Sequence, residues 1–63
     1  MRLTRVRVEA HAQTEENLRV FLLDAFLRSR DDLGGAWEIE DEEYVPANEG
    51  YWGRLTMRRK REP

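Results

Sequence analysis

Residues 14–30 read TEENLRVFLLDAFLRSR, and this stretch decides the fold because its apolar residues recur with helical spacing. Thr14 is a residue type that caps a helix N-terminus, and the two glutamates after it stand where the helix dipole favours negative charge. Gly34 and Gly35 follow, and glycine adopts the left-handed conformation that ends a helix at low cost. The sequence therefore predicts one helix, over residues 14–30.

At 100° per residue the predicted helix carries two apolar stripes. The first, which we expect to cover a sheet, consists of Leu18, Phe21, Leu22, Ala25 and Phe26. The second consists of Val20, Leu23 and Leu27, at spacings of three and four residues. A helix packed on one sheet hides one stripe, and each branched apolar side chain left in water forgoes about 1.5–3 kcal/mol. We therefore expect the second stripe to mediate self-association as a two-fold homodimer, with docking onto a different protein as the alternative.

The segments on either side of the helix alternate between polar and apolar residues, as half-buried strands do. Val6 and Val8, for example, alternate with Arg5 and Arg7. We predict strands over residues 2–10, 36–45 and 51–59, a hairpin loop over 46–50 and a frayed basic tail over 60–63.

The predicted order is β-α-β-β, which makes an α+β two-layer sandwich of one helix on a three-stranded antiparallel sheet. The hairpin sets the third strand antiparallel to the second, and a right-handed crossover through the helix sets the second parallel to the first. Every neighbouring pair is antiparallel if the third strand lies in the middle, so we predict the strand order 1-3-2. With 63 residues, the chain is expected to form a single small domain.

Charge is sorted along the chain, although the net charge is only −2. Residues 31–49 carry eight acids and no Lys or Arg, whereas residues 50–63 carry five bases and one acid. Neighbours on one face of a sheet lie about 4.5–5.5 Å apart, so we expect an acidic and a basic ladder to neutralise each other and to fix the strand register. On the predicted solvent face, the acidic strand presents Glu38, Glu40, Glu42 and Tyr44, and its hairpin partner presents Trp52, Arg54, Thr56 and Arg58.

A partner-binding surface is predicted on the same sheet face, formed by Arg5, Arg7, Trp52, Arg54 and Arg58. Arg5, Arg7 and Trp52 are expected to lie on the side away from the acids. The favoured partner is another protein, because Trp and Arg are enriched at protein contacts. The alternative is a nucleic acid, with bases stacked on Trp52 and phosphates bound by the arginines. The net charge of −2 and acids within a screening length of about 8 Å disfavour this alternative.

The residue types needed for catalysis or metal binding do not gather in this sequence. His11 is the single histidine and there is no cysteine, so the chain holds neither a catalytic triad nor a zinc site. The acids of residues 38–43 lie on a predicted strand, where alternate side chains point to opposite faces and do not converge on one ion. We predict a non-enzymatic protein with no metal and no cofactor. No apolar run approaches the ~20 residues that span a bilayer, and cysteine is lacking, so we expect a soluble cytoplasmic protein.

Two resemblances to known families add to these expectations. The run AWEI at residues 36–39, the chain length and the β-α-β-β order resemble dodecins, which implies a helix on an antiparallel sheet and, as an alternative function, a ligand-binding oligomer. That family's polar flavin-contacting residues are not found here, so no cofactor is predicted. The runs GYWGR at 50–54 and MRR at 57–59 are similar to short Arg- and Glu-rich accessory proteins of actinobacterial phages, which implies that the protein binds or modulates a host protein.

Overall fold

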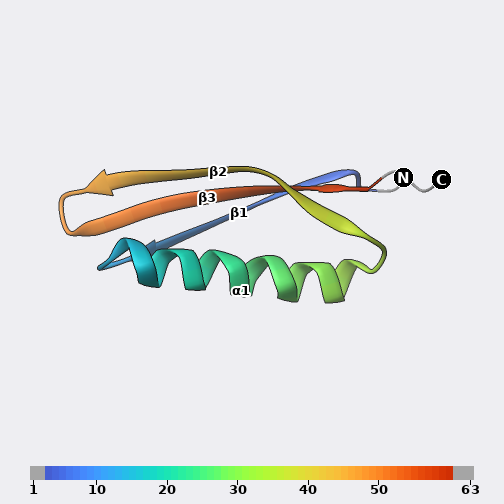
Figure 1. The fold of residues 1–63 in the computed structure, drawn as a ribbon, viewed down its shortest axis with the longest axis horizontal. Coiled ribbons are helices and arrows are strands. Elements are labelled where there is room, and N and C mark those ends of the chain that lie inside the picture. The colour runs from blue at the N-terminus through green and yellow to red at the C-terminus, as the bar shows by residue number, and fades with distance from the viewer. Residues whose placement is uncertain (1–2, 61–63) are drawn as a thin grey trace.

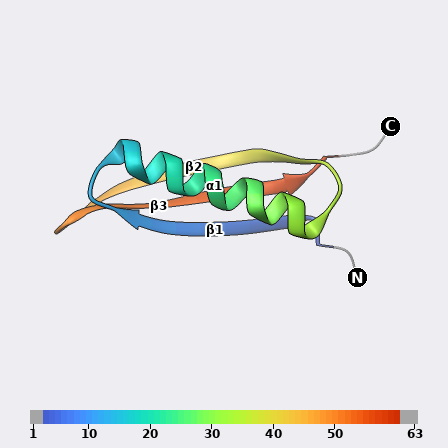
Figure 2. The same ribbon diagram turned by 90° about the horizontal axis from the view of Figure 1, so that it is seen from below.

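The computed structural model describes residues 3–60 and has the predicted element order β-α-β-β. The three strands form one antiparallel sheet in the order β1-β3-β2, and the helix covers one face of it (Figures 1 and 2). The predicted α+β fold and strand order are confirmed. The elements are β1 (Arg5–Ala12), α1 (Glu15–Leu33), β2 (Trp37–Ala47) and β3 (Gly50–Arg59).

The elements differ from the predicted ranges at their ends. α1 runs to Leu33 rather than to residue 30, and β1 continues to Ala12 rather than to residue 10. β2 and β3 extend into the predicted loop, so that Ala47 pairs with Gly50 and a two-residue turn joins them. Gly50 has a φ of +96°, and a Cβ there would collide with the carbonyl oxygen of Ala12, so this turn requires glycine.

The start of the predicted first strand and most of the predicted tail lie outside the described residues, at residue 2 and at 61–63. Lys60 follows the end of β3, and its backbone N–H donates to the carbonyl of Ala36 at 2.9 Å. This hydrogen bond ties the chain leaving β3 to the chain entering β2.

Both ends of α1 are capped as the sequence predicts. The Oγ1 of Thr14 accepts a hydrogen bond from the N–H of Asn17 at 3.2 Å, which satisfies one of the free donors of the first turn. At the other end Gly34 has a φ of +71°, and its N–H donates to the carbonyl of Arg30 at 2.9 Å. These local contacts fix where the helix begins and ends.

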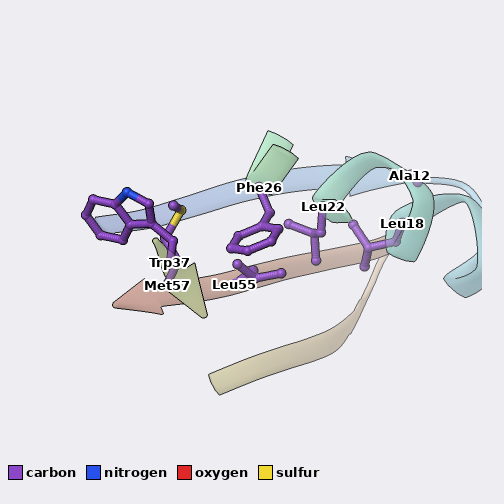
Figure 3. Packing of buried hydrophobic residues seen from close by; sticks show 7 residues of the cluster. All are labelled: Ala12, Leu18, Leu22, Phe26, Trp37, Leu55 and Met57. Carbon is purple, nitrogen blue, oxygen red and sulfur yellow. The ribbon is translucent and has the colours of Figure 1, made fainter. Parts of the chain in front are cut away.

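The core lies between α1 and the sheet and is small. From α1 it takes Leu18, Leu22 and Phe26, which are spaced four residues apart and form one ridge along the helix. Phe21 was predicted in the same stripe but is 50% exposed, because it lies about 60° to one side of Leu18 and 100° from Leu22. Within residues 3–60, the buried apolar side chains are Ala12, Leu18, Leu22, Phe26, Trp37, Leu55 and Met57 (Figure 3).

At Gly53, two leucines of α1 approach the backbone of the sheet closely. A Cβ at this position would lie 2.8 Å from Cδ2 of Leu18 and 3.0 Å from Cδ1 of Leu22. Gly53 is buried in the central strand, and its partner on β1 is the small Ala10. Because Gly53 has no side chain, Leu18 and Leu22 of the helix pack directly on the backbone of β3.

A β-bulge in β2 changes which of its residues face the helix. Ile39 pairs with Met57 and Asp41 pairs with Thr56, so Glu40 is an extra residue between them. Beyond the bulge, Glu42 and Tyr44 lie on the helix side, and Tyr44 packs against the core. The predicted placement of these two residues on the solvent face was wrong, because alternation along the sequence continues only while strand pairing is regular.

We expect Gly53→Ala to lower the free energy of unfolding by about 1–3 kcal/mol, because the added methyl group would collide with Leu18 and Leu22 of α1. The Leu18→Ala background removes the closest atom, so the same glycine substitution should cost less there. Denaturant unfolding of the wild type, both single variants and the double variant measures the coupling. Equal costs in the two backgrounds would show that Leu18 does not rest on Gly53.

Candidate interaction surfaces

The outer sheet face brings together all five residues of the predicted partner-binding surface. β3 lies in the middle, so each of its outward residues has one neighbour on β1 and one on β2. Across the sheet, the resulting rows are Arg5–Arg58–Glu38, Arg7–Thr56–Asp41, Glu9–Arg54–Glu43 and His11–Trp52–Val45. The arginines and Trp52 therefore do share a face, but acids of β2 border the central strand along its length.

Three of the five predicted contact residues are held in ion pairs with acids of β2. Nε of Arg58 lies 2.6 Å from Glu38, and Arg54 pairs with Glu43. The hydrogen bond to Glu38 and the negative charge of Glu38 raise the pKa of Arg58 above its ordinary value. These two pairs are the mutual neutralisation that the sequence predicts for the charge ladders.

Arg5 departs from its predicted position away from the acids. Its Nε lies 2.8 Å from the carboxylate of Glu40, although Arg5 belongs to β1 and Glu40 to the far edge strand. Glu40 is the extra residue of the bulge, and the ion pair crosses the central strand. The expectation that Arg5 is clear of acids was therefore wrong, because a bulge cannot be seen in the sequence pattern.

Arg7 and Glu9 are different from their neighbours on this face. Both are exposed on β1, and within residues 3–60 neither forms an ion pair or a side-chain hydrogen bond. Glu9 lies opposite Arg54, but that guanidinium is bonded to Glu43 on the other side. β1 therefore presents one cation and one anion, two residues apart, with no partner in the described chain.

The second helix stripe is exposed. Val20, Leu23 and Leu27 are 62%, 50% and 38% exposed. On the helical wheel Val20 and Leu27 lie across the helix from the ridge of buried residues, whereas Leu23 lies at the flank of that ridge and lines a groove with residues of the sheet. The stripe is continuous along two turns of α1.

A groove lies between α1 and the middle of β2, because the helix packs mainly on β1 and β3 and leaves Ile39 on the inner side of β2 exposed. The groove has a volume of about 330 Å³, an apolar floor and a polar rim. At the rim, the guanidinium of Arg19 lies 5.5 Å from the ring of Tyr44, whose hydroxyl donates to Glu42 at 3.2 Å. Its lining residues are Arg19, Leu22, Leu23, Ile39, Glu42, Tyr44 and Leu55.

The groove was not predicted, although it adjoins the predicted stripe through Leu23. Residues 40–43 are four consecutive acids, so no apolar residue marks which of them faces inward. The exposed Ile39, which pairs with the buried Met57, is the one sequence signal that β2 has an apolar inner side here. Only strand pairing places Tyr44 on that side.

Trp37 and Arg59 close the other end of the core. The indole N–H of Trp37 donates to the carbonyl of Gly34 at 2.8 Å, and the guanidinium of Arg59 lies 4.4 Å from the Trp37 ring. Arg59 also donates to the carbonyls of Leu3 and Gly34. A polar recess beside Arg59 is lined by Glu38, Arg58 and Lys60, but both of its arginines already have partners.

Within residues 3–60, no group of three or more His, Cys, Asp or Glu side chains is placed to hold a metal ion. α1 is not apolar enough to cross a membrane. Comparison with known protein families, with curated proteins and with solved structures finds no match to this chain.

Tyr44 is a probe of the groove because its pKa is raised above the ordinary 10.0, chiefly by burial and then by the charge and hydrogen bond of Glu42. A raised pKa means that the folded state favours the neutral phenol. Its contribution to stability is present below pH 10 and is lost as the pH rises through the folded-state pKa. In a Tyr51→Phe background, ultraviolet titration should show Tyr44 ionising at higher pH than free tyrosine, and Glu42→Gln should lower that pKa. An unchanged pKa would contradict the contact with Glu42.

Proposed function

We propose that the protein is a small non-enzymatic protein-interaction module that contacts another protein chain with the stripe Val20, Leu23 and Leu27 and the groove beside it. The observation that carries this proposal is the amount of apolar surface left outside the core. Within the described residues, eight large apolar side chains are at least 37% exposed, whereas seven residues make up the core. Five of the exposed ones lie on α1.

A small domain gains stability when a partner covers its exposed apolar side chains. A chain of about 60 residues buries only about 60% of its unfolded surface, so its stability is marginal. Burying a branched apolar side chain contributes about 1.5–3 kcal/mol, and the stripe offers three of them in a row. An apolar surface of this kind, rimmed by charged residues, is typical of a protein contact.

The shape of the surface fits a helix. Leu23 belongs both to the stripe and to the groove, and Ile39 borders it on β2. A second helix lying along α1 on the β2 side would cover these two side chains and fill the groove above Leu22, with Arg19 and Glu42 left at its rim. The sequence predicts that this helix belongs to a second copy of the chain, and a helix of another protein is the alternative.

The resemblance to actinobacterial phage accessory proteins supports the same role, because it implies that such a partner is a host protein. The nucleic-acid alternative is not favoured, since Arg5, Arg54 and Arg58 are already paired with carboxylates. The dodecin-like alternative is not favoured either. The ring of Trp37, which carries that resemblance, is 5% exposed and lies under Arg59.

The substitution Leu23→Glu tests the proposal, with Asn17→Glu as a matched control at an exposed helix position outside the stripe. Because Leu23 is half exposed, we expect the free energy of unfolding of the monomer to change by no more than about 0.5 kcal/mol. Light scattering reports the mass of each variant, and affinity capture from host cytoplasm compares the proteins that each one retains.

If the stripe binds a second copy, Leu23→Glu lowers the mass and Asn17→Glu does not. If it binds another protein, Leu23→Glu loses a captured protein that the wild type and Asn17→Glu both retain. The proposal is contradicted if Leu23→Glu behaves like the wild type in both measurements.

A further inference from the structure

β1 presents a free edge that is suited to pairing with another strand. It lies at one side of the sheet, has eight residues without proline, and pairs with β3 in unbroken register. The carbonyl of Thr4 accepts from the N–H of Arg59, so even-numbered residues of β1 direct their backbone groups to β3. By the alternation of an antiparallel ladder, the backbone groups of Arg7 and Glu9 point outward from the free edge.

We propose that a second copy of this chain pairs with this edge, β1 against β1 and antiparallel, about a two-fold axis at Val8. In that register residue i lies opposite residue 16 − i, so Arg7 faces Glu9 of the other copy and Glu9 faces its Arg7. Side chains opposite each other in a sheet are about 4.5–5.5 Å apart, within reach of an ion pair. Arg7 and Glu9, which form no ion pair within the described residues, thereby each obtain a partner.

Other registers of the same two strands are worse. An axis at Arg7 or at Glu9 sets like charges directly opposite each other, and an axis at Val6 sets Arg5 against Arg7 on both sides. An axis at Ala10 pairs residues 8–12, whereas the axis at Val8 pairs residues 5–11. The Val8 register alone combines the longer pairing with opposite charges.

On the face of the sheet that carries the helices, the two copies of β1 would also bring apolar side chains together. Val6, Val8 and Ala10 are partly buried against the core and would meet their counterparts across the axis. Phe21 lies on the opposite flank of α1 from Leu23, which faces the β2 groove, and Phe21 is 50% exposed.

β2 does not offer the same contact. Its residues 40–43 are all acidic, and pairing β2 with β2 would set carboxylates against carboxylates. The bulge at Glu40 and Pro46 interrupt that edge further. A dimer through β1 therefore closes, with an acidic strand at each end of a six-stranded sheet.

This contact goes beyond the proposed function, because it gives self-association a surface other than the stripe of Val20, Leu23 and Leu27. Both helices of the dimer lie on one face of the joined sheet, so the two stripes stay uncovered on the same side. The dimer would then present two copies of the surface proposed to bind another protein.

Reversing the charges of Arg7 and Glu9 in the β1–β1 contact tests the inference. Arg7→Glu alone, or Glu9→Arg alone, sets like charges opposite each other twice, and we expect either to raise the dimer dissociation constant about tenfold or more at low salt. The double variant Arg7→Glu with Glu9→Arg restores opposite charges and should restore the dimer. Both residues are exposed, so denaturant unfolding serves to check that each monomer stays folded.

Sedimentation equilibrium gives the masses, and amide hydrogen exchange gives an independent measurement. The N–H groups of Arg7 and Glu9 should be protected at concentrations where the dimer forms and should exchange rapidly on dilution. A monomer at all concentrations up to about 1 mM, with rapid exchange at both amides, would overturn the inference. So would a dimer that dissociates with Leu23→Glu but not with Arg7→Glu, a result that would leave the stripe as a contact surface and thus the proposed function intact.

Discussion

Leu18 and Leu22 of α1 rest on the bare backbone of Gly53, and this contact sets the lateral position of the helix on the sheet. Because Gly53 is in β3 beside Ala10, the helix packs mainly on β3 and β1 and leaves Ile39 on the inner side of β2 exposed. The groove, the exposed flank at Phe21 and the uncovered stripe all follow from that position. A helix of this size on a three-stranded sheet cannot cover every apolar residue that the sequence supplies.

The bulge at Glu40 is the second constraint, and it acts on charge. By shifting the alternation of β2, it turns Tyr44 and Glu42 toward the helix and brings Asp41 and Glu43 to the outer face. It also allows Glu40 to meet Arg5 across the central strand. The outer face thereby becomes largely self-neutralised. Among its charged residues within the described part of the chain, Arg7 and Glu9 on β1 and Asp41 on β2 form no ion pair. The two edges of the sheet therefore differ in what they can accept.

Much of the fold was predictable because its signals are local. The cap at Thr14, the glycine at residue 34 and the four-residue spacing of Leu18, Leu22 and Phe26 depend only on neighbours in the chain. The same is true of the pairs Arg58–Glu38 and Arg54–Glu43, which follow from a hairpin of opposite charges. The predicted stripe is indeed exposed, because helical periodicity places it opposite the ridge that the sheet buries.

What the sequence by itself determined, then, is the type and order of the elements, their caps and the sorting of charge between strands. The tertiary structure decided which acids face outward, where Arg5 finds its partner and which strand the helix leaves uncovered. The physical reason is that a bulge arises only when two strands pair, and the position of a helix on a sheet is set only when the two pack together. Residues 40–43 contain no apolar side chain to mark a face, and the importance of Gly53 is visible only once two leucines are resting on it.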